Sequence, residues 1–284
     1  MHCNTNLIKG ALFVLFPLVL FSACSQTSNG GLTDVDDNGG YASDASRIEW
    51  ANNDVISLAD AAGEVYNSAY MRTTHTTLGT CATVATDTIS TPHTLIIRFG
   101  TQDCACLDGR NRKGSIIISY NGEYSDSGQV HTITFDNYNI NDNQLTGTIE
   151  TIRVDTTVVT GHWYYDVLVN DSMNISQSPL NSQYVVWSGS LVRKWVSGIT
   201  TGDRSDDAFS ISGSATLTRA NGHQFTFNMS SPIQFAMNCN YAESGIITVN
   251  GYEGSRVLNY GSGNCDALAQ VNIGANVYNI TLTP

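Results

Sequence analysis

The sequence predicts a mainly β protein with one N-terminal helix, folded as an antiparallel β-sandwich or as one large twisted sheet of about twelve strands. Three observations predict this class. Apolar and polar residues alternate through most of the chain after Met71, turn pairs such as Asn121-Gly122 and Asn221-Gly222 separate the alternating segments, and no second helical pattern follows the first. Because parallel strands need long crossover connections, we expect these strands to pair antiparallel.

Residues 1–23 have the pattern of an export signal. Lys9 supplies the positive charge, and the apolar run from Ala11 to Ala23 is shorter than the roughly 20 residues that a membrane-spanning helix needs. The run ends in Phe21-Ser22-Ala23-Cys24, in which small residues precede a cysteine as they do at a bacterial lipidation site. The pattern predicts a palmitate-bearing lipoprotein anchored through Cys24 to the cell envelope, and Ser25 favours the outer membrane.

Residues 24–46 are polar, acidic and rich in glycine, which is typical of a flexible tether. Asp34, Asp36 and Asn38 match the first half of a calcium-binding loop, but Ala45 stands where the bidentate Glu of that loop belongs. We therefore expect a solvated linker here and no metal site.

Residues 47–284 are expected to form a single domain. Apolar residues recur every three or four positions after Asp54, which predicts a helix over about 54–70 with Asp54 as its N-cap. Later segments change to period two, as in Phe209–Thr218, Ile116–Tyr120 and Tyr278–Leu282. Each is expected to be a strand with one face in the core and one face in water.

The cysteines indicate two related halves, at about 72–160 and 205–284. Phe99-Gly100 is followed by Cys104 at the same distance as Tyr260-Gly261 is followed by Cys265. Cys81 and Cys239 lie upstream at similar range, and Gly114 and Gly274 each precede an apolar run. Since exported proteins meet oxidising conditions, we expect Cys239 to pair with Cys265, and Cys81 with Cys104 or with its neighbour Cys106. Zinc is the rival use of these cysteines, but their spacing does not fit tetrahedral coordination.

Composition excludes several kinds of partner and cofactor. With Lys+Arg 13 against Asp+Glu 25 and a net charge of −12, the chain lacks the clustered positive charge that nucleic-acid binding requires. No cofactor motif is present. The five histidines beyond the signal are not paired at metal-ligand spacing, and no G-x-S-x-G elbow is found; they are His75, His93, His131, His162 and His223.

Two groups of side chains remain as candidates for binding. Trp163, Trp187 and Trp195 lie on predicted strands, and Trp187 and Trp195 share one face. We expect them in the core, because buried aromatic residues are the commoner case; if exposed, they would instead form a stacking platform for sugars. Charged clusters occur in loops, and we expect them to solvate the surface or neutralise one another; they are Asp203 with Asp206 and Asp207, Asp136 with Asp142, and Arg110 and Arg112 with Lys113. The acidic ones are candidates for glycoside hydrolysis.

Several segments resemble a family of uncharacterised lipoproteins from Bacteroidota. These are the run from Phe99 to Gly114 with its Cys104-Ala-Cys106 pair, the segment His131–Tyr138, and Tyr260-Gly261 with Cys265-Asp266. The resemblance covers about residues 47 to 284. It implies no activity or ligand, because none is associated with that family.

The sequence favours a non-enzymatic role over an enzymatic one. We expect a lipid-anchored β-protein of the cell envelope with a structural or interaction role, whose partners are the membrane and an envelope protein or glycan. The alternatives are a glycan-binding accessory lipoprotein that uses the tryptophans, and a secreted glycoside hydrolase that uses loop carboxylates.

Overall fold

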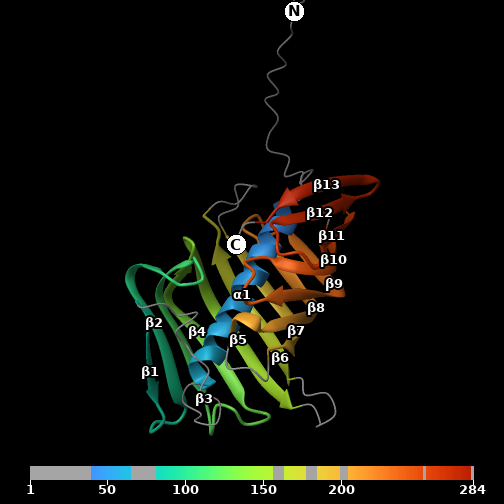
Figure 1. Ribbon diagram of the computed structural model, residues 1–284. Helices are drawn as coiled ribbons and strands as arrows, with labels where there is room; N and C mark the ends of the chain where they lie inside the picture. The colour runs from blue at the N-terminus through green and yellow to red at the C-terminus, as the bar shows by residue number, and fades with distance from the viewer. Residues whose placement is uncertain are drawn as a thin grey trace, which may run out of the picture. The chain divides into compact units, whose positions relative to one another are not determined.

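The computed structural model describes residues 40–64, 81–155, 163–176, 184–198, 204–251 and 254–282, all of which belong to one compact unit. Within these residues one helix, α1 (Gly40–Glu64), lies across one face of a single antiparallel sheet of 13 strands (Figure 1). The prediction of a large antiparallel sheet with one N-terminal helix is confirmed, and of the two arrangements expected, the chain adopts the single sheet.

The strands follow one another in space in the order of the chain, so each pairs with its sequence neighbours. They are β1 (Thr83–Asp87), β2 (His93–Ala105), β3 (Asn111–Tyr120), β4 (Val130–Ile140), β5 (Asn143–Asp155), β6 (Trp163–Asn174), β7 (Val185–Ser197), β8 (Ala208–Arg219), β9 (Gln224–Ala236), β10 (Ala242–Gly251), β11 (Gly254–Ser262), β12 (Leu268–Ile273) and β13 (Asn276–Thr281), with a short 3-10 helix η2 (Arg204–Asp206) before β8. Short turns rich in Gly, Asn and Asp are sufficient for this topology, because every connection joins adjacent antiparallel strands.

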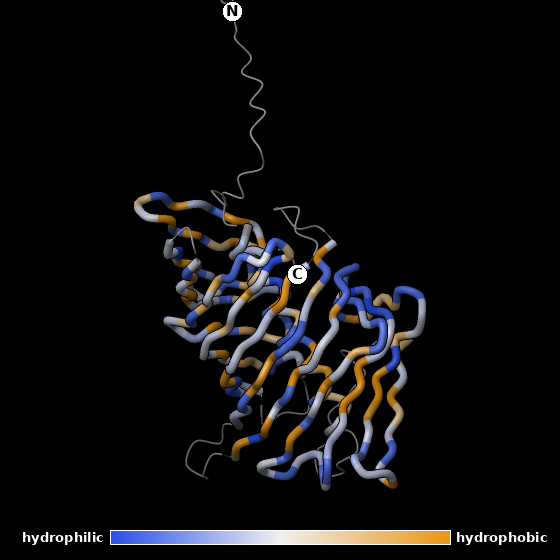
Figure 2. The backbone as a smooth tube through the Cα atoms, turned by 180° about the vertical axis from the view of Figure 1, so that it is seen from behind, coloured by the Kyte–Doolittle hydropathy of each residue, from blue (hydrophilic) through white to orange (hydrophobic). Residues whose placement is uncertain are grey.

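Each strand has one face towards α1 and one face away from it, as the period-two pattern predicts. In β8 the side chains of Phe209, Ile211 and Leu217 are buried, while Ser212 and Thr216 on the other face are partly exposed. Seen from behind, the strands therefore change repeatedly between hydrophobic and hydrophilic residues along their length (Figure 2).

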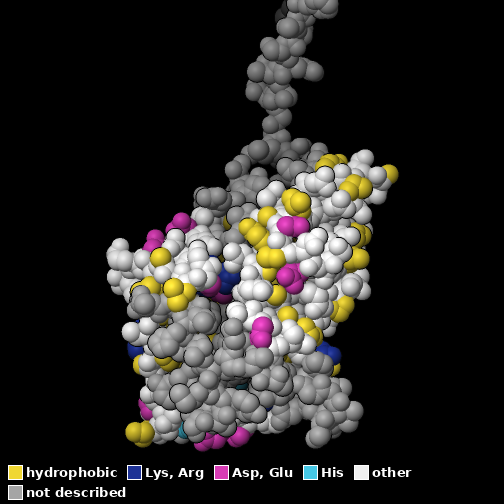
Figure 3. Space-filling model, viewed as in Figure 1, with side chains coloured by type: hydrophobic (Ala, Val, Ile, Leu, Met, Phe, Trp, Pro, Cys, Tyr) yellow, Lys and Arg dark blue, Asp and Glu magenta, His cyan; other side chains and the backbone are white. Residues whose placement is uncertain are grey.

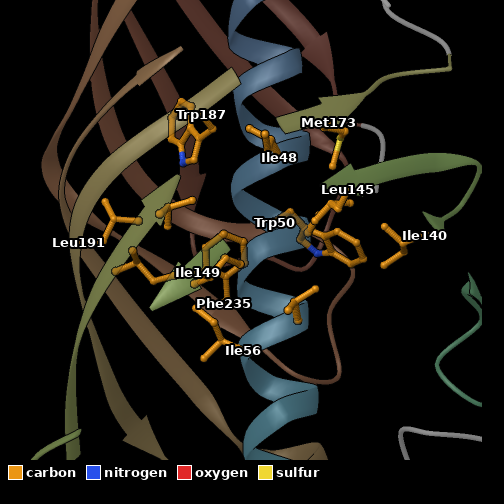
Figure 4. Close-up of a cluster of buried hydrophobic side chains, with 14 of the residues drawn as sticks. Ile48, Trp50, Ile56, Ile140, Leu145, Ile149, Met173, Trp187, Leu191 and Phe235 are labelled. Atoms are coloured by element: carbon orange, nitrogen blue, oxygen red, sulfur yellow. The ribbon is translucent and has the colours of Figure 1, made fainter. Parts of the chain in front are cut away.

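The hydrophobic core lies between α1 and the sheet. Ile48, Trp50 and Ile56 of the helix are buried among side chains from strands far apart in the sheet, which in Figure 4 lie on both sides of the helix; these include Ile140, Leu145, Ile149, Met173, Trp187, Leu191 and Phe235. Figure 4 also shows that the helix offers apolar side chains in more than one direction. The sheet thus packs on more of the helix than a single apolar stripe would cover.

The position of α1 corrects two expectations. The helix begins at Gly40, whereas the sequence predicted a start near Asp54, and the described residues of the helix end at Glu64. Residues 40–46, expected to belong to the tether, are helical, and Tyr41, Asp44 and Ala45 are buried. The spacing of three and four residues also runs through this first half, at Tyr41, Ala45 and Ile48, but the polar residues between them give it the composition of a linker.

The two halves place their disulfides at equivalent positions, as expected, but they do not place Gly114 and Gly274 equivalently. Cys81 precedes β1 and pairs with Cys104 near the end of β2, and Cys239 precedes β10 and pairs with Cys265, which follows β11. Gly114, however, lies within β3 opposite Gly100, whereas Gly274 lies in the turn between β12 and β13. The similarity therefore covers the two stapled hairpins and does not extend to the strand after them.

Candidate binding groove and buried polar clusters

Buried charges fix α1 against the sheet. Arg193 of β7 donates to Asp60 Oδ2 at 3.0 Å, to Ser57 Oγ at 2.8 Å and to Asn53 Oδ1 at 3.1 Å. Arg219 of β8 donates to Asp44 Oδ2 at 3.4 Å. Because a buried charge is costly unless it is paired, these contacts fix the helix in one register rather than add much net stability.

The basic group at Arg110 and Arg112 belongs to the same internal network. Arg112 Nη2 lies 2.8 Å from Asp54 Oδ2 and 2.7 Å from Asp108 Oδ2, and Arg110 Nη1 lies 2.6 Å from Asp54 Oδ1. Burial alone would raise the pKa of Asp108, but its hydrogen bond to Arg112 and the charges of both arginines hold that pKa below its ordinary value. These arginines neutralise neighbouring carboxylates, as expected, and are not open to a ligand.

A second buried cluster contains two carboxyl groups that form no ion pair with any residue that the structure describes. Glu49 of α1 is fully buried and lies beside the indole of Trp187, and Asp171 of β6 lies beside the amide of Asn52. Glu49 Oε2 and both carboxyl oxygens of Asp171 have no hydrogen-bond partner among the described residues. Burial raises the pKa of Glu49 to about 7, and burial together with the charge of Glu49 raises that of Asp171 well above its ordinary value.

Trp187 and Trp195 are buried, as expected, at 1% exposure each, and so they form no exposed platform for sugars. Trp187 packs against Phe227 and Trp195 against Phe209, so both belong to the inner face of the sheet. Their shared face is the one covered by α1, which period two alone does not reveal. The side chain of Trp163 lies outside the described part of the structure.

The described loop carboxylates lie in different surroundings. Asp207 is completely buried, Asp142 lies 4.0 Å from Lys113, and Asp136 accepts a hydrogen bond from Asn137. On the face viewed in Figure 3, acidic side chains are spread among neutral ones. Asp203, the acidic half-motif at 34–38 and Cys24 lie outside the described residues, as do His75 and His162.

The cysteines pair as the sequence predicts, with Cys104 rather than Cys106 as the partner of Cys81. Cys239 and Cys265 form the second bridge, and Cys106 is a buried free thiol. The donor atoms of Cys239, Glu243 and Cys265 lie within 4.8 Å of one another, but both sulfurs are bonded to each other and so supply no thiolate for a metal.

A hollow with a volume of about 470 Å³ lies over β11–β13. Three amide side chains cross it as a ladder, since Asn259 of β11 is paired with Gln270 of β12, and Gln270 with Asn279 of β13. Gln270 Nε2 donates to Asn279 Oδ1 at 3.3 Å, and Asn259 Oδ1 accepts from the backbone N–H of Gly261 at 2.9 Å. We call this hollow the amide groove.

The wall of the amide groove is the loop that follows β11. Ser262, Asn264 and Asp266 line it, and the disulfide at Cys265 ties the loop to Cys239 before β10. Asp266 Oδ1 accepts the backbone N–H of Leu268 at 2.9 Å, and the Gly263 N–H donates to the Glu243 carbonyl at 2.8 Å. The loop is therefore held in shape before any ligand binds, and the hollow is within the usual size range of small-ligand sites.

The described lining of the groove is mostly neutral and polar. Asp266 is the one carboxylate among its described lining residues, which include no histidine or cysteine. Tyr260 also lines it, but its hydroxyl is buried and lies 2.6 Å from Ser46 Oγ. Retaining and inverting glycosidases both need two carboxylates on either side of the scissile bond, and this lining supplies one.

The sequence analysis did not identify the amide groove. The sequence does contain the residues that form it: Asn259, Gln270 and Asn279 lie at solvent-facing positions of three segments with period-two patterns. Their alignment depends on the register of β11–β13, which spacing alone does not fix.

Among the described residues no helix combines the length and the apolar character needed to cross a bilayer. The chain matches no family model, and no curated protein or solved structure is significantly similar to it. The resemblance to Bacteroidota lipoproteins therefore stays a prediction.

Proposed function

We propose that the protein is a non-enzymatic interaction protein, anchored to the cell envelope through lipid on Cys24, which binds a neutral, hydroxyl-rich ligand of the glycan class in the amide groove. The sequence around Cys24 supports the anchor. The observation that carries the binding role is the ladder of Asn259, Gln270 and Asn279 in a hollow whose described lining has one carboxylate, that of Asp266.

Amide side chains suit a ligand with many hydroxyl groups. Each offers an acceptor oxygen and an NH₂ group with two donors, and a sugar hydroxyl both donates and accepts. Neighbouring strands lie about 4.8 Å apart, so the ladder presents these groups at a regular spacing. The hydrogen bond from Gln270 to Asn279, and the one that Asn259 accepts from the Gly261 backbone, hold the three amides in place, which lowers the entropy lost on binding.

Charge favours a neutral ligand over an acidic one. Asp266 lines the groove, and the chain as a whole has a net charge of −12. No lysine or arginine is present among the described lining residues to pair with a carboxylate or sulfate. An anionic glycan would therefore be repelled, whereas a neutral one would not.

A glycan array probed with the full chain in detergent tests the proposal. We expect binding to neutral oligosaccharides, weakened about fivefold for each hydrogen bond lost in Gln270→Ala or Asn279→Ala. Asn272→Ala is the matched control, because Asn272 is an exposed amide on β12 that does not line the groove. The proposal is wrong if no glycan binds, or if both groove variants bind as the wild type does.

The glycosidase alternative is measured in the same experiment. Mass spectrometry of the bound oligosaccharides should show them intact after prolonged incubation. Cleavage would instead mean that a second carboxylate reaches the ligand.

A further inference from the structure

We propose that Cys81, Cys104 and Cys106 form a thiol–disulfide exchange centre that makes Cys81 an attachment site for a ligand carrying a disulfide. This inference is independent of the amide groove. It starts from the free thiol that remains after the two disulfides are formed.

The free thiol lies against the disulfide. Cys106 Sγ is 3.9 Å from Cys104 Sγ, and both side chains are buried, at 6% and 3% exposure. Cys81, the other sulfur of the bridge, belongs to an exposed residue. The three cysteines thus place a buried thiol next to a buried disulfide sulfur, whose bonding partner Cys81 is an exposed residue.

The internal exchange needs no external oxidant or reductant, and the disulfide ligand RSSR is the oxidant of the step that follows it. The Cys106 thiolate attacks Cys104 Sγ, a Cys104–Cys106 bond forms, and the Cys81–Cys104 bond breaks. Cys81 leaves as a thiolate, and the proton of the Cys106 thiol passes to solvent. The exposed Cys81 thiolate then attacks a disulfide RSSR, which forms Cys81–SR and releases RS⁻.

The surroundings of Cys106 affect how readily its thiol forms the thiolate that the exchange needs. Burial raises the pKa of the Cys106 thiol, while the guanidinium of Arg112 acts in the opposite direction. The other ionisable groups that face this thiol are Asp108, Asp54 and Tyr138. The one-residue spacer strains a Cys104–Cys106 ring, so the new pairing is expected to be a minor state that a disulfide ligand traps.

The second disulfide supplies an internal control. Cys239 and Cys265 have no free thiol near them among the described cysteines, since Cys106 is the one free cysteine there and contacts Cys104. An exchange that depends on Cys106 should leave this bridge intact.

The test uses the full chain in detergent with DTNB as the disulfide probe, acid quenching and peptide mapping without reduction. We expect a thionitrobenzoate adduct on Cys81, a Cys104–Cys106 bond and an unchanged Cys239–Cys265 bridge. Cys106→Ser and Cys106→Ala should both show no adduct on Cys81. As a check on the thiol itself, wild-type protein unfolded in urea should react at once.

Three results would overturn the proposal. An adduct on Cys106 beside an intact Cys81–Cys104 bridge would mean that the thiol reacts directly. An adduct on Cys81 in either Cys106 variant would mean that the bridge opens by another route. No adduct on any of the three cysteines in the folded protein would mean that the centre does not exchange.

Discussion

Replacing the buried carboxyl of Glu49 should make the protein more stable at neutral pH and should leave its stability almost unchanged in acid. Glu49 is 2% exposed, and burial raises its pKa from the ordinary 4.5 to about 7. In Glu49→Gln the amide keeps the shape of the side chain but carries no charge.

The sign follows from proton linkage. A carboxyl whose pKa is raised by folding favours the folded state most below its unfolded pKa of 4.5, where it is protonated in both states. This contribution is lost as the pH rises through the folded pKa of about 7, because the folded state must then bury a charge. At about 1.4 kcal/mol per pH unit, the full loss is about 3 kcal/mol above pH 7.

Urea unfolding followed by tryptophan fluorescence at several pH values measures this effect. Glu49→Gln should exceed the wild type by up to about 3 kcal/mol at pH 8 and match it near pH 4. Glu123→Gln, at an exposed position, is the matched control and should show no such difference. A Glu49→Gln effect that is the same at both pH values would refute the reasoning, because an uncharged contact would then account for it.

Three further predictions test the other structural claims. Arg193→Met should destabilise the protein by about 3–5 kcal/mol, because it leaves Asp60 buried without its cation. Adding Asp60→Asn should recover much of that loss, and urea unfolding of the single and double variants measures both effects. Gly114→Ala should lower the free energy of unfolding by about 2 kcal/mol more than Gly128→Ala. Both glycines have positive φ, but only at Gly114 would the new methyl group clash with the backbone of a neighbouring strand. Thermal unfolding compares the two variants, and equal losses of stability would contradict the close packing at Gly114. Cys24→Ser should abolish palmitate labelling and release the protein from membranes, and labelling that persists would disprove the anchor.

Most of the sheet could be predicted from the sequence, because the alternation of apolar and polar residues within a strand distinguishes its buried face from its exposed face. Phe209, Ile211 and Leu217 alternate with hydroxyl side chains, and the structure buries them as that alternation predicts. The cysteine pairs were predictable for a related reason. Cys239 and Cys265 flank one hairpin, so antiparallel pairing brings them together.

The helix could be predicted only in part, because its first half is buried by contacts from distant strands. Asp44 and Ser46 look like linker residues in the sequence, yet Arg219 and Tyr260 bind them in the structure. Such partners are separated from the helix by more than 170 residues, and no local pattern reveals them.

The amide groove was missed for a similar reason. Each of Asn259, Gln270 and Asn279 is an ordinary polar residue on a strand, and only the register of three strands makes them a ladder. The tryptophans illustrate the same limit for the core. Their spacing places Trp187 and Trp195 on one face of the strand, but it does not show which face of the sheet α1 covers.

The central claim, that the amide groove is the binding site, is tested most directly by the side-chain amide signals of the full chain in detergent during titration with a neutral oligosaccharide that the array identifies. The account predicts that the NH₂ resonances of Asn259, Gln270 and Asn279 shift together with one binding constant, while that of Asn272 does not move. Shifts confined to amides outside β11–β13, with the three ladder signals unchanged at saturation, would contradict it.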